Sequence, residues 1–137
     1  MKLKSSIIQL PKLEDSRGNL SFVESDEHIP FSIKRTYWIY DVPGGQKRSG
    51  HAYKTQHEFI IAISGSFDVM VNDGKNSLKY SLNRSYYGLY IPNMNWRSLE
   101  NFSTNSLCLI LSSEVFDETD YIKNLRVFKK LCNQIPK

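Results

Sequence analysis

One stretch of the chain brings together side chains that can move protons or bind metal ions. His51, Tyr53 and Glu58 follow Gly50 closely, and Gly65 ends the apolar run behind them. Residues two apart on a strand project from the same face, so His51 and Tyr53 would point the same way. An imidazole, with an ordinary pKa of about 6.5, suits a general base near neutral pH. This stretch is therefore the first candidate for a reactive site, although a lone histidine can also be purely structural.

Metal binding is a weaker explanation of the same residues. His51 and Glu58 would supply two ligands, whereas catalytic metal sites usually have three protein ligands. The later segment at 88–97, which could add another, contains no histidine. We therefore expect no metal and no other cofactor, and a metal-dependent oxygenase or isomerase stays a third possibility.

Length and charge narrow the class of protein. The 137 residues, 40% of them hydrophobic, fit one domain spanning 1–137. The net charge of +4 favours an anionic partner. Because no helix-turn-helix, zinc or RNA-recognition motif is present, we expect a nucleotide-linked small molecule and no nucleic acid. No run of about 18 apolar residues and no signal-peptide core occurs, which predicts a cytoplasmic protein that does not enter membranes. Cys108 and Cys132 are expected to be reduced thiols.

Short apolar segments separated by turns predict an all-β fold. Asn72, Asp73 and Gly74 form a strong hairpin turn, because glycine tolerates positive φ. The strands are expected at residues 7–10, 20–24, 33–42, 58–64, 66–71, 77–80, 88–91 and 106–112. The aromatic segment 33–42 could pair with a second copy in a homodimer.

The end of the chain has a different pattern. Ile122, Leu125, Phe128 and Leu131 are spaced by three, which predicts one amphipathic C-terminal helix. It would begin near residue 117, where Asp117 or Thr119 could cap it.

Several motifs in order resemble one family. They lie at residues 15–18, 48–54, 63–67, 82–92, 96–97, 111–114 and 121–122. They are similar to the cupin-fold sugar 3,4-ketoisomerases of the WxcM-like family, and the resemblance covers nearly the whole chain. It implies a jelly-roll, RmlC-like cupin β-barrel with one C-terminal helix. It also implies an isomerase that moves the carbonyl of dTDP-4-keto-6-deoxyglucose from C4 to C3, so that an aminotransferase can install a 3-amino group.

The expected chemistry needs a base, an acid and a binding surface. The C3 hydrogen lies α to the C4 carbonyl, so its removal gives an enediolate, and a proton returned at C4 leaves the ketone at C3. We assign His51 as the base that carries this proton. Tyr37, a neutral phenol with an ordinary pKa near 10, would donate to the sugar oxygen, although it could equally pack the core. Substrate binding is assigned to Arg17, Arg48, Tyr53, Lys54, Trp96 and Arg97, with solvated or core positions as the alternative for each.

The stereochemical outcome at C4 depends on conflicting residues. The best-known branch of the family has His-Ala-His where this chain has residues 51–53, and it gives the galacto product. Tyr53 and Arg97 resemble the branch that keeps the gluco configuration, whereas Arg17 resembles the inverting branch. We expect the gluco product.

Two other functions remain open. A non-catalytic sugar-nucleotide-binding cupin would keep the basic and aromatic lining without depending on His51. A dTDP-sugar epimerase of the related barrel type also begins by removing a proton next to a C4 ketone, but it would need a His-Asp pair, and no aspartate stands out here as that partner.

Overall fold

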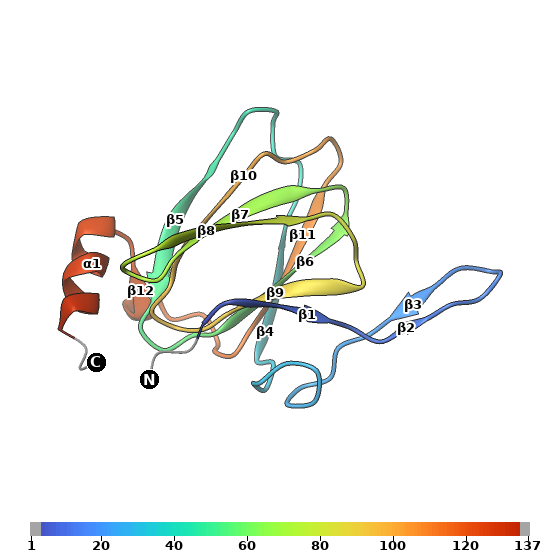
Figure 1. Ribbon diagram of the computed structural model, residues 1–137, viewed down its shortest axis with the longest axis horizontal. Helices are drawn as coiled ribbons and strands as arrows, with labels where there is room; N and C mark the ends of the chain where they lie inside the picture. The colour runs from blue at the N-terminus through green and yellow to red at the C-terminus, as the bar shows by residue number, and fades with distance from the viewer. Residues whose placement is uncertain (1–3, 135–137) are drawn as a thin grey trace.

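The computed structural model describes residues 4–134, which form two five-stranded antiparallel sheets that face each other (Figure 1). The first sheet has the order β1 (Ser6–Gln9), β9 (Tyr87–Ile91), β6 (Glu58–Ser64), β11 (Leu107–Ser112), β4 (Arg35–Ile39). The second has the order β12 (Tyr121–Ile122), β5 (Arg48–Tyr53), β10 (Trp96–Glu100), β7 (Phe67–Asn72), β8 (Ser77–Leu82). This confirms the predicted all-β fold.

The main core lies between the two sheets. Alternate side chains of β7, namely Phe67, Val69 and Val71, are buried there. They meet Ile60 of β6 and Ile110 of β11 from the opposite sheet. This alternation follows from the two-residue period of a strand, and it also fixes which polar residues point inward.

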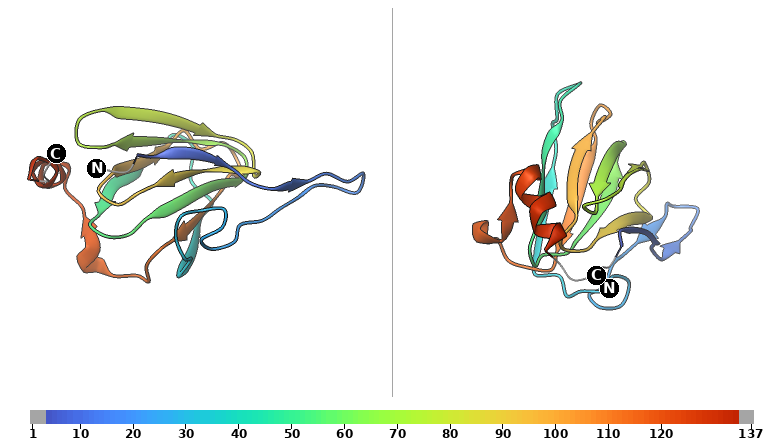
Figure 2. Two further views of the ribbon diagram at one scale, coloured as in Figure 1. Left: turned by 60° about the horizontal axis from the view of Figure 1, so that its bottom comes forward. Right: turned by 60° about the vertical axis from the view of Figure 1, so that its left-hand side comes forward.

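A two-stranded ribbon, β2 (Lys12–Leu13) and β3 (Leu20–Ser21), projects away from the body of the molecule, and α1 lies at the opposite end (Figures 1 and 2). The strand expected over 20–24 is shorter than predicted because the ribbon pairs with neither large sheet. The predicted turn at Asn72–Gly74 is confirmed: Gly74 has φ +103° and donates its backbone N–H to Asn72 Oδ1 at 2.7 Å.

The C-terminal helix is present but begins later than expected. The structure places α1 at Leu125–Asn133, where the Asn124 side chain accepts from the backbone N–H groups of Arg126 and Val127. Asp117 instead caps a single 3₁₀ turn, η1 (Glu118–Asp120), and Ile122 lies in β12. The prediction of one helix from residue 117 was wrong at its start because Ile122 is buried by pairing with β5.

Gly50 is required by the close approach of an indole ring. A Cβ added there would lie 2.2 Å from Trp96 Nε1 and 2.6 Å from its Cε2. Trp96 cannot retreat freely, because it packs against Phe128 of α1 with ring centroids 5.9 Å apart. We expect Gly50→Ala to lower the free energy of unfolding by about 1–3 kcal/mol, measured by urea denaturation. Gly44→Ala is the control, since a Cβ there meets nothing within 4 Å; equal stability of the two variants would contradict this packing.

Candidate active site

A pocket of about 450 Å³ opens between the two sheets. Strands β4, β5, β10 and β12 all contribute to its wall. It is lined by Tyr37, Ile39, Lys47, Arg48, His51, Tyr53, Arg97 and Tyr121. Seven of these eight side chains carry a polar group, and the positive charges of Lys47, Arg48 and Arg97 suit an anionic ligand.

His51 and Tyr53 lie on the pocket side of β5, as the strand period predicts. His51 Nε2 is 2.8 Å from the Tyr53 hydroxyl oxygen, and their rings meet edge to face. The ring of Tyr121 lies 5.1 Å from that of His51 and 4.6 Å from that of Tyr53, centroid to centroid. The intervening Ala52 points away and is buried in the cluster beneath α1. The imidazole and the two phenol rings therefore form one three-ring cluster, in which His51 is partly buried and lines the pocket.

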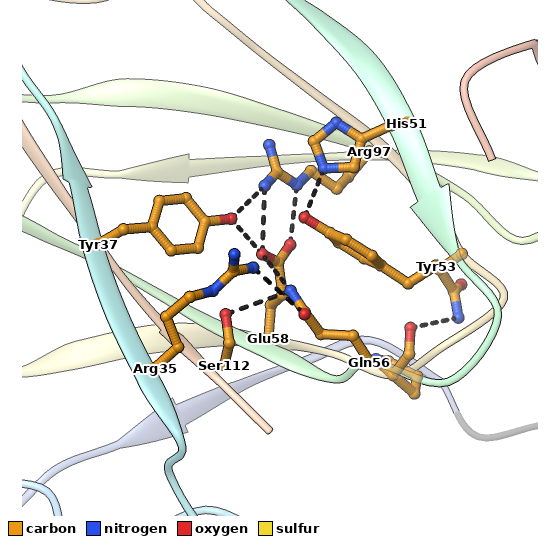
Figure 3. Close-up of polar contacts among 10 residues, drawn as sticks. Arg35, Tyr37, His51, Tyr53, Gln56, Glu58, Arg97 and Ser112 are labelled. Carbon is orange, nitrogen blue, oxygen red and sulfur yellow. Dashed lines mark hydrogen bonds and ion pairs between the residues drawn. The ribbon is translucent and has the colours of Figure 1, made fainter. Parts of the chain in front are cut away.

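The floor of the pocket holds a buried ion pair. Arg97 of β10 donates from Nε to Glu58 Oε1 at 3.0 Å and from Nη2 to Glu58 Oε2 at 3.3 Å (Figure 3). The two side chains are 4% and 2% exposed. Because Glu58 opens β6 and Arg97 lies in β10, this pair joins the two sheets.

Tyr37 completes the polar floor. Its hydroxyl donates to Glu58 Oε2 and accepts from Arg97 Nη2 at 2.9 Å. A phenol oxygen has one proton and two lone pairs, and these two bonds use the proton and one lone pair of Tyr37. The phenol therefore lies between a carboxylate that holds its proton and a guanidinium that would stabilise a phenolate.

Burial and charge set the protonation of these groups. Burial raises the pKa of Tyr37 well above its ordinary value, and the Glu58 carboxylate adds to this while Arg97 opposes it. Burial also raises the pKa of Glu58, but the charge and hydrogen bonds of Arg97 and the Tyr37 hydroxyl more than offset this, so the pKa lies below its ordinary value. At neutral pH Glu58 is ionised and Tyr37 carries its proton.

His51 is neutral over the same pH range. Burial lowers its pKa to about 4, and the positive charge of Arg97 adds to this, while Glu58 opposes it. A neutral imidazole can accept a proton, so we expect kcat/KM to stay level from neutral pH down to the region of this lowered pKa. It should fall only as His51 becomes protonated in the free enzyme. A pH profile of kcat/KM with an acid limb centred near 6.5, the ordinary histidine value, would contradict the burial of this ring.

Among the residues assigned from the sequence, Tyr37, Arg48, His51, Tyr53 and Arg97 come together in the pocket. Arg97 was assigned to the substrate, yet two of its nitrogens bind Glu58 and Tyr37. Its Nη1 takes part in none of these hydrogen bonds.

Three assigned residues lie outside the pocket lining. Arg17 is in the turn of the β2–β3 ribbon, where it pairs with Asp15 at 2.8 Å and its side chain is 88% exposed. Lys54 follows Tyr53, the last residue of β5, is exposed, and is not among the residues that line the pocket. Trp96 packs beneath α1, on the side of β10 opposite Arg97. For these residues a contact with substrate stays a prediction.

Sequence reasoning did not assign Glu58 or Tyr121 to the site. A single acidic residue opening the apolar strand Glu58–Ser64 was an available signal for Glu58, since a buried carboxylate requires a partner. For Tyr121 the available signal was its place in the family motif at residues 121–122. Within residues 4–134, no group of three or more His, Cys, Asp or Glu side chains is placed to hold a metal ion. In the same part of the chain no helix is long and apolar enough to cross a membrane.

Known proteins that are similar to this chain are isomerases of nucleotide-linked sugars. A curated relative from Aneurinibacillus thermoaerophilus, a TDP-4-oxo-6-deoxy-alpha-D-glucose-3,4-oxoisomerase, is 35% identical over 133 residues, which cover 97% of this chain and 96% of the relative. The structure of the TDP-quinovose 3,4-ketoisomerase WlaRB from Campylobacter jejuni is 40% identical with a TM-score of 0.89, covering 92% of this chain and 97% of that one.

Two further structures extend the comparison. A histidine-to-asparagine mutant of the 3,4-ketoisomerase QdtA from Thermoanaerobacterium thermosaccharolyticum, in complex with TDP-4-keto-6-deoxyglucose, is 30% identical with a TM-score of 0.93, covering 98% of this chain and 97% of that one. A dTDP-4-dehydrorhamnose 3,5-epimerase from Bacillus anthracis is 14% identical with a TM-score of 0.76, which shows a shared fold and confirms the predicted cupin-type barrel. The family model described as WxcM-like, C-terminal matches residues 3–133. The chain therefore belongs to the WxcM-like family of sugar 3,4-ketoisomerases, as its motifs predicted.

Proposed function

We propose that this protein moves the keto group of dTDP-4-keto-6-deoxyglucose from C4 to C3. The observation that carries the proposal is a neutral imidazole and a neutral phenol in one pocket, beside a buried Glu58–Arg97 pair. These groups supply the base and the acid that the reaction needs. The names of the relatives, all TDP-sugar isomerases, support this choice of substrate.

His51 is proposed to carry the carbon-bound proton. Its unprotonated nitrogen removes the hydrogen from C3, and the C3–H electron pair forms the C3–C4 double bond. The imidazolium then returns a proton to C4 as the ketone forms at C3. One base can serve both carbons because they are neighbours, and contacts with the rings of Tyr53 and Tyr121 restrain the imidazole.

Tyr37 is proposed to move the oxygen-bound proton, which passes from O3 to O4 as the carbon-bound proton passes from C3 to C4. It donates to O4 as charge develops there, which gives an enediol, and the resulting phenolate is stabilised by the N–H of Arg97 at 2.9 Å. It then takes the proton from O3 as C3 becomes the carbonyl. Both amino acids finish in their starting protonation states, so no cofactor or net proton is consumed.

We expect Tyr37→Phe to lower kcat by about 10²-fold with little change in KM, because the lost hydroxyl acts mainly in the transition state. Initial rates measured by NMR with purified substrate would give both constants. Tyr80→Phe is the matched control, since the Tyr80 hydroxyl contacts Ser5 rather than the pocket. Unchanged kcat in Tyr37→Phe would remove Tyr37 from the mechanism.

The diphosphate is proposed to bind at the basic mouth of the pocket. Lys47 and Arg48 line it, and guanidinium groups match phosphate oxygens with two parallel donors. Arg17, Lys54 and Trp96 keep their predicted roles in binding only if substrate or a second copy brings them near this mouth.

The gluco product is proposed at C4. Tyr53 and Arg97 favour it, and the WlaRB relative is named for TDP-quinovose; Arg17 favours the galacto product instead. The product would then pass to an aminotransferase that installs a 3-amino group.

Product NMR in deuterated water tests the function and the stereochemistry together. We expect a 3-keto product from dTDP-4-keto-6-deoxyglucose, with deuterium at C4 on the face that retains the gluco configuration. A galacto product would overturn the stereochemical assignment alone. Binding without any carbonyl migration would instead identify a sugar-nucleotide-binding protein.

A homodimer in the cytoplasm is the expected working form. Trp38 and Tyr40 of the β4 region and Ile63 of β6 are 56%, 61% and 41% exposed, and such apolar groups on one sheet favour an interface. Sedimentation equilibrium would test this, with a monomer contradicting it.

A further inference from the structure

Gln56 is a buried amide directly behind the proposed acid. Gln56 is only 2% exposed. Its Nε2 donates to Glu58 Oε2 at 3.3 Å and to Ser112 Oγ at 3.2 Å (Figure 3). The loop that carries it is held separately, because the Asp120 carboxylate accepts the backbone N–H groups of Thr55 and Gln56 at 2.9 and 3.1 Å. The backbone at residue 56 is therefore held independently of the Gln56 side chain, whose own contacts place the amide.

The orientation of this amide follows from its other partner. Arg35 Nη2 donates to Gln56 Oε1 at 3.3 Å. A guanidinium has donors only, so it must face the oxygen of the amide and leave the NH₂ group toward Glu58. Arg35 is itself placed over the Tyr37 ring, with its central carbon 4.9 Å from the ring centroid.

Glu58 Oε2 consequently has three donors: Tyr37 Oη, Arg97 Nη2 and Gln56 Nε2. If Tyr37 gives its proton to substrate, this oxygen loses one of the three. A buried carboxylate oxygen left without sufficient donors carries a large desolvation cost. Arg97 Nη2 also bonds the Tyr37 oxygen, so it is shared between two acceptors. Gln56 Nε2 does not bond Tyr37, so it remains available to Glu58 Oε2.

We propose that Gln56 is a positioning residue that stabilises the Glu58 carboxylate while the proton of Tyr37 is on the substrate. This inference rests on the proposed function. In the proton-transfer step the Tyr37 O–H bond breaks and an O–H bond forms at O4 of the sugar. The electron pair stays on the phenolate, and Glu58 keeps its charge throughout. Gln56 exchanges no proton and touches no substrate.

The test uses Gln56→Met, which keeps the length of the side chain and removes the amide. The Gln56–Glu58 bond is present before the transfer and strengthens when the Tyr37 proton leaves, so kcat should lose only that gain. Because a hydrogen bond to a charged group contributes about 1.5–3 kcal/mol in all, the fall in kcat should be measurable and at most about a hundredfold. KM and the dissociation constant for TDP should stay unchanged. The Tyr37 hydroxyl proton should keep its NMR signal in Gln56→Met, because Glu58 Oε2 has lost one donor and still accepts from this hydroxyl. The signal is assigned by its absence from Tyr37→Phe.

Two variants separate this role from simple packing. Ser112→Ala removes the second acceptor of the Gln56 NH₂ group, leaves its bonds to Glu58 and Arg35, and should leave kcat unchanged. Gln56→Asn withdraws the amide from Glu58 and should repeat the loss of kcat if Gln56→Met fails to fold. Full kcat in a folded Gln56 variant would overturn the proposal, as would loss of both the Tyr37 signal and TDP binding, which would indicate a collapsed site. Wild-type protein that does not convert the sugar would overturn the proposed function instead, and the Tyr37 signal can still be read without turnover.

Discussion

Replacing His51 with asparagine is expected to lower kcat by about 10²–10⁴-fold, the usual contribution of a positioned general base. Asparagine retains a polar group near Tyr53 but cannot accept and return a proton. The variant should still bind TDP, because the basic mouth formed by Lys47 and Arg48 is untouched. Turnover by NMR and TDP affinity by calorimetry would measure the two effects separately.

A matched control distinguishes catalysis from the general effect of losing a histidine. His28 lies in a loop outside the pocket, where its Nδ1 accepts the backbone N–H of Glu24 at 2.9 Å. His28→Asn should leave kcat unchanged. Equal activity of the His51 and His28 variants would mean that the imidazole of His51 is structural.

The largest loss of stability is expected from Arg97→Met. Both members of the Glu58–Arg97 pair are almost fully buried, so removing the cation leaves a carboxylate without its main partner. Breaking a buried ion pair in this way costs about 3–5 kcal/mol. That is a large part of the roughly 5–15 kcal/mol that stabilises a typical domain. Urea denaturation should show a much lower midpoint, and kcat should also collapse because Tyr37 loses the N–H that stabilises its phenolate.

The double variant Arg97→Met with Glu58→Leu separates the two consequences. It removes both charges and replaces them with apolar groups, which is often neutral or stabilising at buried positions. We therefore expect most of the stability to return while kcat stays low. If the loss in free energy of unfolding of the double variant equals the sum of the losses of the two single variants, Glu58 and Arg97 are not coupled, contrary to the observed geometry.

The fold could be predicted where local pattern and final structure agree. Residues 59–63 form a continuous apolar run, which predicts a buried strand, and the structure has β6 at Glu58–Ser64. The start of α1 could not be predicted, because Ile122 has helical spacing yet pairs with Ala52 in a neighbouring strand. Only tertiary pairing decides between these two uses of an apolar residue.

The site was predictable in part for the same reason. His51 and Tyr53 share a strand, so their common face follows from a two-residue period. Glu58 and Arg97 lie 39 residues apart in sequence and on different sheets. Their contact depends on the packing distance between sheets, which no local pattern encodes. Arg97 was consequently assigned to substrate binding alone, and only the structure shows that its guanidinium also bonds Glu58 and Tyr37.

The central claim is that the imidazole of His51 removes the hydrogen from C3 of the sugar. The most direct test is to incubate dTDP-4-keto-6-deoxyglucose in deuterated water with His51→Asn and with Tyr37→Phe, and to follow the C3 proton signal together with carbonyl position by NMR. We predict that the C3 hydrogen is retained with His51→Asn and is lost slowly with Tyr37→Phe. Loss of the C3 hydrogen at the wild-type rate in His51→Asn would contradict the account.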